Sequence, residues 1–372
     1  MAESRAVLLA AGGTGGHLFP AEATAAALAR RGLAVELATD ARALKYSGAF
    51  SFRAVHQIAS ATPRGSSLAS KARAVFMLAR GTLAARKLLG RTKPLCVVGF
   101  GGYPTVPPIL AASQLRIPSI LHEQNAVMGS ANRFLAKRVD RLACGFSTLK
   151  GVDESLRGKM RHTGNPLRPT VIEAARSAYP DFADGRLRIL VTGGSQGARV
   201  MSDIAPAAIE LLSPALRSRL SVVQQARSED EQRVREIYAR LGVSAEVASF
   251  FADLPARMAA SHLVIARAGA STVSELAAIG RPSILVPFPF ALDQDQAANA
   301  AQLAATGAAE VVPQSAFTAA WLAGALERAM ADPQDLTRRA EAAKSAGIVD
   351  AAERLADLVM SLVATRPSPE RA

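Results

Sequence analysis

The chain has 372 residues, of which 49% are apolar, and a formal net charge of +13. This length and apolar content predict two domains with sizeable cores and exclude a largely disordered chain, and no run reaches the roughly 20 apolar residues of a membrane-spanning helix. Only two cysteines and a start without a signal-peptide pattern exclude a disulfide framework and predict a soluble, cytosolic protein.

Apolar runs of the β-strand type alternate with alanine-rich helical stretches through the first half of the chain. The runs are AVLLAA (6–11), LAVELAT (33–39), LCVVGF (95–100) and PSILHEQ (118–124). Continuous apolar strands separated by helices are typical of a parallel sheet covered on both faces. We therefore expect an α/β domain of the Rossmann-like type.

The positive charge is concentrated in this half. No acidic residue occurs between Asp40 and Glu123. The same window holds twelve basic residues: Arg42, Lys45, Arg53, Arg64, Lys71, Arg73, Arg80, Arg86, Lys87, Arg91, Lys93 and Arg116. This asymmetry predicts a face that attracts a polyanion, which leaves nucleic acid, an anionic membrane and a phosphorylated substrate open.

The pattern then restarts. Arg5–His17 and Leu187–Arg199 share one plan, in which a basic residue precedes an apolar strand, a glycine-rich loop and a helix. The stretch His162–Ala175 between them is rich in Pro and Gly and is interpreted as an interdomain linker. Further buried strands are expected within 220–226, 262–269 and 282–289. The sequence thus predicts two Rossmann-like domains whose parallel sheets face a deep cleft.

Three glycine-bearing turns follow strands and open helices: Gly12–Gly16, Gly193–Gly197 and Arg267–Thr272. Glycine lets a backbone approach a ligand closely, and the following helix N-terminus favours an anion. One such loop could be only a tight turn, but three favour phosphate binding. The spacing fits neither the dinucleotide G-x-G-x-x-G pattern nor the nucleoside-triphosphate loop, which disfavours NAD and ATP.

Seven blocks occur in order between about Ala6 and Val312: GGTGGHLFPA, GFGGYPTVPP, LHEQNAVMGSANRFLA, GNPLR, VTGGSQGAR, RAGASTVSEL and VPFPFALDQDQAANA. Together they resemble the MurG family within glycosyltransferase family 28. The resemblance implies a GT-B fold, with an acceptor- and membrane-binding domain at 1–164, helices at about 346–363 packing back on it, and a UDP-sugar-binding domain at 165–345. It implies inverting transfer of N-acetylglucosamine from UDP-N-acetylglucosamine to a lipid-linked muramyl-pentapeptide in peptidoglycan synthesis, at the cytoplasmic face of the inner membrane.

The resemblance also implies which residues contact the donor. Arg168 and the Gly193–Gly197 loop would face the diphosphate, Phe251 the uracil, Glu275 the ribose hydroxyls, and Gln294 or Gln296 the sugar. The implied donor-binding set is Thr14, Gly15, Gly16, Asn125, Arg168, Ser195, Phe251, Ala270, Ser271, Thr272, Glu275, Gln294 and Gln296. An alternative for Glu275 is a helix acid that only complements the dipole.

No cofactor and no bound metal are expected. Asp293 and Asp295 form a D-x-D pair, which binds a divalent ion in another glycosyltransferase class, but such a pair often arises by chance. The resemblance instead implies that helix dipoles and basic side chains stabilise the departing UDP.

His17, at the exit of the first glycine loop, is the candidate general base. Inversion at the anomeric centre by a single displacement needs one base and no covalent intermediate, and histidine has a suitable pKa. The alternatives are that His17 only packs at the helix start, or that Glu123 is the base. An alternative role for Glu123 is that it only orders its loop.

Ser67–Lys93 is predicted to be a helix with apolar side chains clustered among basic ones. An acceptor with a polyprenyl tail stays in the bilayer, so this helix is the expected docking element on anionic lipid. The expected docking residues are Lys71, Arg73, Val75, Phe76, Arg80 and Arg86. The alternative is an ordinary amphipathic helix with a solvated basic face.

Three rival functions remain from the sequence. A non-hydrolysing UDP-N-acetylglucosamine epimerase shares the fold but needs no acceptor. A glycosyltransferase acting on diacylglycerol is a closer relative, distinguished by the HEQN block (122–125). Nucleic-acid binding is disfavoured because the basic window has few aromatics for base stacking and no nucleic-acid motif. Other cell-wall synthesis proteins are additional candidate partners.

Overall fold

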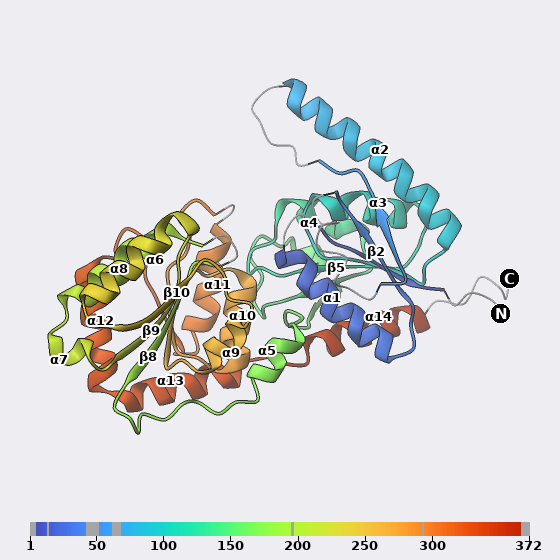
Figure 1. The fold of residues 1–372 in the computed structure, drawn as a ribbon. Helices are drawn as coiled ribbons and strands as arrows, with labels where there is room; N and C mark the ends of the chain where they lie inside the picture. The colour runs from blue at the N-terminus through green and yellow to red at the C-terminus, as the bar shows by residue number, and fades with distance from the viewer. Residues whose placement is uncertain are drawn as a thin grey trace. The chain divides into compact units, whose positions relative to one another are not determined.

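The computed structural model describes residues 5–12, 15–41, 52–61, 68–194, 197–291 and 294–365. The chain divides into two compact units, the first made of Met1–Arg168 with Asp350–Ala372 and the second of Pro169–Val349 (Figure 1). The sequence placed the first boundary at 164/165, within the Pro- and Gly-rich stretch, whereas the division lies at 168/169.

The described residues of the first unit form a seven-stranded sheet in which neighbouring strands are parallel. The central strands are buried on both faces, which explains their continuous apolar sequences. In spatial order the strands are β3 (Ala54–Gln57), β2 (Val35–Thr39), β1 (Val7–Ala10), β4 (Cys96–Gly99), β5 (Ser119–Glu123), β6 (Arg141–Cys144) and β7 (Met160–His162).

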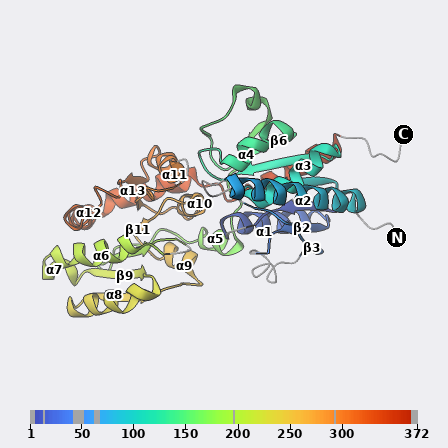
Figure 2. The same ribbon diagram turned by 90° about the horizontal axis from the view of Figure 1, so that it is seen from above.

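Two groups of helices cover this sheet. The α-helices are α1 (Gly15–Arg30), α2 (Leu68–Thr92), α3 (Val106–Gln114), α4 (Ser130–Leu135) and α14 (Ala351–Ala364), and the 3-10 helices are η2 (Tyr103–Thr105), η3 (Ala136–Arg138) and η4 (Glu154–Lys159). One core cluster joins α1 and α14 to the sheet, and another joins α2, α3 and α4 to it. Helices α2 and α3 lie side by side in both ribbon views (Figures 1 and 2).

Helix α2 confirms the helix predicted for Ser67–Lys93. Its inner face consists of small and apolar residues, among them Ala74, Gly81, Ala85 and Leu89, which are buried. A Cβ on Gly81 would lie 2.1 Å from the Ala59 carbonyl oxygen, so only glycine allows this close approach to the segment after β3. The basic side chains therefore lie on the outer face.

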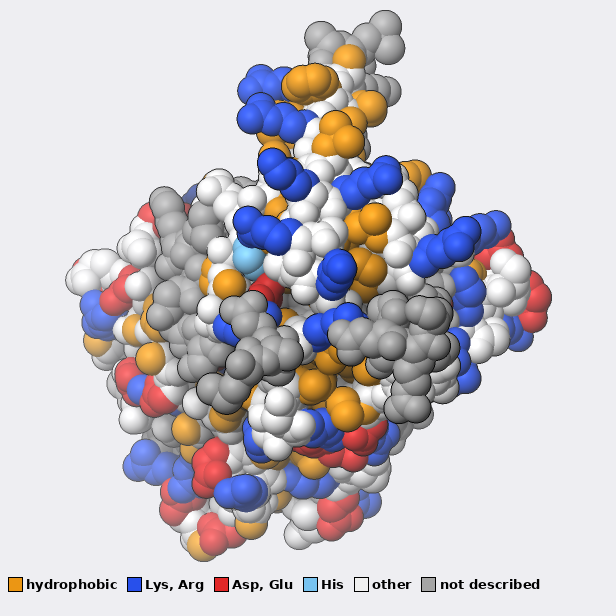
Figure 3. Space-filling model, turned by 90° about the vertical axis from the view of Figure 1, so that its right-hand side faces the viewer, with side chains coloured by type: hydrophobic (Ala, Val, Ile, Leu, Met, Phe, Trp, Pro, Cys, Tyr) orange, Lys and Arg blue, Asp and Glu red, His pale blue; other side chains and the backbone are white. Residues whose placement is uncertain are grey.

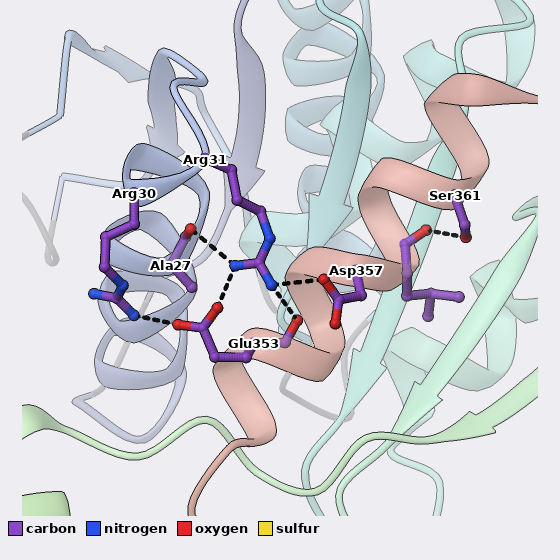
Figure 4. A network of polar contacts seen from close by, with 7 residues as sticks. Ala27, Arg30, Arg31, Glu353, Asp357 and Ser361 are labelled. Carbon is purple, nitrogen blue, oxygen red and sulfur yellow. Dashed lines mark hydrogen bonds and ion pairs between the residues drawn. The ribbon is translucent and has the colours of Figure 1, made fainter.

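Helix α14 returns from the end of the chain to pack against α1. Leu355 and Val359 are fully buried in the shared core. At the surface, Glu353 accepts hydrogen bonds from both Arg30 and Arg31, and Arg31 also donates to Asp357 at 2.6 Å (Figure 4). These contacts fix the C-terminal helix to the first unit.

The described residues of the second unit form a six-stranded parallel sheet. In spatial order its strands are β10 (Ser244–Ala248), β9 (Leu220–Gln225), β8 (Leu187–Thr192), β11 (Leu263–Ala266), β12 (Ser283–Leu285) and β13 (Ala309–Val311). Numbered within its own unit, each sheet begins in the order third, second, first, fourth, fifth, sixth. This shared order confirms the repetition predicted from the two glycine-loop segments.

The helices of the second unit are α5 (Pro169–Ala174), α6 (Arg199–Leu211), α7 (Pro214–Arg217), α8 (Ser228–Arg240), α9 (Leu254–Ala259), α10 (Ala270–Ile279), α11 (Asp295–Ala304), α12 (Ala319–Ala331) and α13 (Pro333–Ala346). Helix α6 packs against α8 and α12, and Figure 2 shows α6 and α8 side by side. Helix α10 packs against α9, α11 and α13.

Arg281 is a fully buried cation in this unit. Its guanidinium donates to the carbonyl oxygens of Met258 and Ala259 at the end of α9, of Ile279 and Gly280 at the end of α10, and of Ala178. The negative ends of two helix dipoles thus surround the charge. Arg281 holds α9, α10 and the segment after α5 together.

Candidate functional site

Each unit presents its glycine-rich loop at the carboxyl edge of its sheet, where the strand order reverses. In the first unit the order reverses between β1 and β4, and in the second between β8 and β11. Ligands of open parallel sheets bind at this position. The loops that follow these strands therefore define one candidate site in each unit.

His17 lies in the first turn of α1, directly after the β1 loop. Its Nδ1 atom is 2.8 Å from Oε1 of Gln124, a buried side chain that follows β5. Burial lowers the pKa of His17, while the hydrogen bonds to Gln124 and the Phe100 carbonyl act in the opposite direction. The imidazole is therefore neutral near pH 7, as a general base must be.

Glu123 ends β5 and is buried, with 3% of its surface exposed. Its carboxylate accepts hydrogen bonds from the backbone N–H groups of Asn125 and Gly129, both at 3.0 Å, and from Asn132 Nδ2 at 2.8 Å. Burial raises its pKa, and these donors oppose the rise. The geometry joins this carboxylate to the loop from Asn125 to Gly129.

Five residues of the donor set predicted from the sequence belong to the first unit. Asn125 is half-buried beside Glu123. The Arg168 guanidinium lies over the ring of Phe19, 4.8 Å from the ring centroid, on the exposed side of α1. Gly15 and Gly16 begin α1, so their backbone N–H groups lie at its N-terminus, whereas Thr14 lies outside the described residues.

In the second unit, Gln225 at the end of β9 supports the loop after β8. Its Oε1 accepts from Thr192 Oγ1 at 2.8 Å and from the Gly193 N–H at 3.2 Å, and its Nε2 donates to the Ser249 carbonyl. A Cβ on Gly193 would lie 2.1 Å from the Ala198 nitrogen, so the turn requires glycine there. Ser195, predicted to face the diphosphate, lies outside the described residues.

Helix α10 begins directly after the loop that follows β11. Ala270, Ser271 and Thr272 form its first turn, whose N–H groups have no partners within the helix. Glu275 lies farther along the same helix and is buried, with 8% of its surface exposed. The segment thus combines a helix N-terminus, suited to an anion, with a nearby carboxylate.

The two candidate glutamines of the sugar loop differ in their surroundings. Gln296 Oε1 accepts from the N–H groups of Ala268 at 3.3 Å and Phe288 at 3.0 Å, so its carbonyl joins two strand-end loops. Gln294 is exposed and has a left-handed backbone with φ of 52° at the start of α11. This contrast favours Gln294 as the side chain available to a ligand.

Phe251, predicted to meet the uracil through its backbone, follows β10. Its side chain is buried under the Arg257 guanidinium, 4.3 Å from the ring centroid. The neighbouring Phe250 is exposed instead. Burial of the Phe251 ring fixes the backbone at this edge of the sheet.

The outer face of α2 carries apolar and basic side chains together, as Figure 3 shows for the helix at its top. Val75, Phe76 and Leu83 are 66%, 64% and 69% exposed. Arg73, Arg80 and Arg86 are exposed beside them. The Lys71 side chain lies outside the described part of the chain, and Leu83 was missed from the sequence.

Among the described residues, no group of three or more His, Cys, Asp or Glu side chains could hold a metal ion. Asp293 of the D-x-D pair lies outside these residues. Asp295 begins α11, and one of its carboxylate oxygens accepts from the Gln296 N–H at 2.7 Å. Within the same described ranges, no helix is both long and apolar enough to cross a membrane.

Gln124 and Gln225 were missed from the sequence, although each has a structural role at its site. The available signal was position, since both are polar residues that end or follow a buried strand at the ligand-binding edge. Glutamine has no distinctive chemistry, and its partners are revealed only by the folded structure.

Residues 7–144 match the Glycosyltransferase family 28 N-terminal domain, and residues 188–355 match the Glycosyltransferase family 28 C-terminal domain. A curated relative from Methylobacterium radiotolerans is 58% identical over 360 residues, covering 96% of this chain and 98% of its own length. Its name is "UDP-N-acetylglucosamine--N-acetylmuramyl-(pentapeptide) pyrophosphoryl-undecaprenol N-acetylglucosamine transferase".

The crystal structure of Acinetobacter baumannii MurG has a TM-score of 0.79 and 29% identity, covering 96% of this chain and 99% of that one. A UDP-GlcNAc 2-epimerase from Neisseria meningitidis has a TM-score of 0.64 over 95% of this chain and 99% of its own, but only 16% identity, so this likeness concerns the fold alone. The predicted fold class, α/β with two parallel-sheet domains of the GT-B type, is confirmed.

Proposed function

The chain belongs to glycosyltransferase family 28, and we propose that it transfers N-acetylglucosamine from UDP-N-acetylglucosamine to undecaprenyl-pyrophosphoryl-N-acetylmuramyl-pentapeptide. The acceptor atom is the 4-hydroxyl of the muramyl sugar, and the product is the disaccharide lipid of peptidoglycan synthesis. The observation that carries this proposal is the 58% identity, over 96% of the chain, to a relative named for this reaction. The two proteins also agree in length, because the match covers 98% of that relative.

Donor binding is assigned to the second unit. The N–H groups of the loop after β8, together with Ser195, face the diphosphate, and the N-terminus of α10 (Ala270 to Thr272) stabilises its charge. The Glu275 carboxylate accepts from the two ribose hydroxyls. The backbone of Phe251 meets the uracil, and Gln294 contacts the sugar while Gln296 holds its loop.

The first unit provides the acceptor chemistry. His17 takes the proton of the acceptor hydroxyl as its oxygen forms a bond to C1 of N-acetylglucosamine. The bond from C1 to the UDP oxygen breaks in the same displacement, which inverts the anomeric centre to a β-1,4 linkage. The donor sugar and its diphosphate are contacted from this unit by Thr14, Gly15, Gly16 and Asn125. Arg168 offers a positive charge to the diphosphate.

Glu123 is assigned to ordering the loop rather than to base catalysis. Its carboxylate accepts from the backbone N–H groups of Asn125 and Gly129 and from the side chains of Asn132 and Asn125. Taking up a proton would weaken these bonds and release the loop. The hydrogen bonds of Glu123 thus support the proposal that His17, and not Glu123, is the base.

The lipid-linked acceptor requires the enzyme to work at the membrane surface. The outer face of α2 supplies exposed apolar side chains (Val75, Phe76, Leu83) amid arginines. Each basic residue near an anionic surface contributes about 1 kcal/mol, and the apolar side chains add interfacial burial. We assign α2, with Lys71, as the element that docks peripherally on the cytoplasmic leaflet.

The test is transfer of radiolabelled N-acetylglucosamine from UDP-N-acetylglucosamine to a polyprenyl-linked muramyl-pentapeptide. Parallel reactions contain the donor alone and the donor with diacylglycerol. Label is expected in the muramyl lipid only. An epimer from the donor alone, or labelled diacylglycerol without labelled muramyl lipid, would overturn the assignment.

A further inference from the structure

The orientation of the Gln124 amide is fixed by a backbone carbonyl. Its Nε2 donates to the Phe100 oxygen at 3.1 Å, just after β4. A carbonyl oxygen can only accept, so the NH2 group, and not the amide oxygen, faces Phe100. The amide oxygen is thereby directed to the other side, where it lies 2.8 Å from His17 Nδ1.

This orientation places a hydrogen-bond acceptor against Nδ1 of His17. An amide oxygen has no proton to donate, so a hydrogen bond at this distance requires the proton to be on Nδ1. In a neutral imidazole the other nitrogen then carries the lone pair. Nε2 is consequently the atom that can accept a proton.

Gln124 is itself held in place by neighbouring residues. The side chain has 6% of its surface exposed. Asn165, after β7, donates through Nδ2 to the backbone carbonyl of Gln124 at 3.0 Å. The residues on either side of Gln124 are hydrogen-bonded to each other, because the Asn125 N–H donates to the Glu123 carboxylate. The backbone and the amide are therefore both fixed before any ligand binds.

The opposite edge of the imidazole faces two glycines. Gly101 and Gly102 have φ angles of 84° and 69°, in the left-handed region that favours glycine. A Cβ on Gly102 would lie 3.4 Å from His17 Nε2. The absence of a side chain on Gly102 therefore leaves space beside Nε2.

The protonation state of the surroundings is compatible with this arrangement. Burial lowers the pKa of His17. His122, of the adjacent strand β5, is the titratable neighbour, and burial lowers its pKa to about 4. Both rings are therefore neutral near pH 7, and titration of His122 lies well below the working range.

We propose that Gln124 is a positioning residue that holds His17 in the tautomer with the proton on Nδ1, so that Nε2 receives the proton of the acceptor hydroxyl. The inference rests on the proposed function, in which His17 is the base. In serine proteases, loss of the group that holds the catalytic histidine in its tautomer lowers kcat by about 10⁴. Gln124 is uncharged, so the expected loss here is smaller, about 10- to 100-fold.

The direct test is nitrogen NMR of the full-length protein labelled with ¹⁵N-histidine, at pH 7.5 and without ligands. The His17 signals are assigned by their loss in His17→Ala. In the wild type we expect Nδ1 to have the shift of a protonated nitrogen and Nε2 that of an unprotonated one. In Gln124→Leu the two tautomers become mixed.

Gln224→Leu is the matched control. Gln224 is a buried glutamine of β9 in the second unit, and its Nε2 also donates to a backbone carbonyl, that of Met201. Removing this amide creates a comparable packing and hydrogen-bond defect away from His17. The tautomer of His17 is expected to stay as in the wild type in this control.

Kinetics give the second readout, for which Gln124→Glu is the informative variant. One oxygen of its carboxylate still accepts from Nδ1, whereas the other can no longer donate to the Phe100 carbonyl. Its negative charge favours the imidazolium, so it raises the pKa of His17. A general base works when unprotonated, so the acid limb of kcat/KM shifts to higher pH. At pH values above the new limb, Gln124→Glu recovers most of the kcat lost in Gln124→Leu, with KM for the donor unchanged in both.

The outcomes are distinguishable. A wild-type His17 with its proton on Nε2, or an unchanged tautomer in Gln124→Leu, overturns the role of Gln124. Equal losses in Gln124→Leu and Gln124→Glu, with no shift of the pH limb, also overturn it and indicate a merely structural residue. Normal turnover of His17→Ala would instead overturn the base assignment of the proposed function, while the NMR result would still decide the tautomer.

Discussion

Reversing the charge of α2 tests how the protein reaches a lipid-linked substrate. The variant replaces Arg73, Arg80 and Arg86 with Glu, three exposed positions on the outer face of the helix. Each basic residue near an anionic surface contributes about 1 kcal/mol. Replacing an attraction by a repulsion roughly doubles the effect, so the expected loss is about 6 kcal/mol, or about 10⁴-fold in partitioning.

The assay is co-sedimentation with vesicles of phosphatidylglycerol and phosphatidylcholine, over a series of salt concentrations. Wild-type binding should weaken as salt rises, because the Debye length falls below about 10 Å above 0.1 M. The variant should lose its preference for anionic vesicles. The fold is expected to persist because the buried face of α2, including Ala74, Gly81 and Ala85, is unchanged.

A matched control makes the same change in net charge in the second unit, by replacing the exposed Arg240, Arg328 and Arg338 with Glu. Their ion pairs lie at the surface and contribute little to stability. This control should bind anionic vesicles nearly as well as the wild type. Both variants should retain activity on a short-chain, water-soluble acceptor. Equal vesicle binding by the α2 variant and the wild type would refute docking through α2.

Three further substitutions test other parts of the molecule. Glu275→Ala should weaken UDP-N-acetylglucosamine binding by about 10- to 100-fold in calorimetry, because two hydrogen bonds to a charged acceptor are lost; unchanged affinity would remove Glu275 from the donor site. Arg281→Met should lower the free energy of unfolding by about 3 kcal/mol or more in urea denaturation, because the carbonyl oxygens that Arg281 now satisfies stay buried without partners; a loss below about 1 kcal/mol would contradict this. Burial alone would raise the pKa of Glu36, but its hydrogen bonds from Arg53 and His56 lower it. The ionised Glu36 carboxylate therefore stabilises the fold above its unfolded-state pKa, and this stabilisation is lost as the pH falls through its folded-state pKa. Glu36→Gln should accordingly cost about 1–3 kcal/mol at pH 7 and much less at pH 3, and a cost independent of pH would exclude the ion pair as its cause.

The parallel-sheet architecture was predictable because buried central strands leave a direct trace in the sequence. β1, β4 and β11 are continuous apolar runs, β8 is interrupted only by Arg188 before its final Thr192, and each begins a strand–loop–helix unit. The peripheral strands were not found. β3 and β7 are the two edge strands of the first sheet, and β10 is an edge strand of the second. Their residues are partly exposed, so their sequences resemble those of loops.

The sequence proposes site residues where their chemistry is distinctive. Glycine loops, a histidine at a helix start and a carboxylate in α10 each indicate a role through residue type and position. The proposal of His17 over Glu123 rests on hydrogen bonds, which only the fold supplies. The partners of Gln124 are backbone and side-chain atoms far away in the chain, and His17 is 107 positions from it.

The long-range contacts that hold the fold together could not be predicted from the sequence either. Arg31 and Glu353 are 322 positions apart, yet they join α14 to the end of α1. Neither residue differs in type from the many other charged residues of the surface. The return of the C-terminal helices was implied by family resemblance, whereas the contacts that hold α14 in place are known from the structure.

The proposed chemistry depends most directly on His17, so the decisive measurement is turnover by His17→Ala with a lipid-linked muramyl-pentapeptide acceptor, alongside calorimetric binding of UDP-N-acetylglucosamine. Loss of a general base lowers the rate by about 10²–10⁴-fold, and donor affinity should stay close to that of the wild type because the second unit provides most of the donor contacts. A β-1,4-linked product from the wild type and this loss in the variant are the predicted results. Near-normal turnover by His17→Ala would contradict base catalysis by this residue.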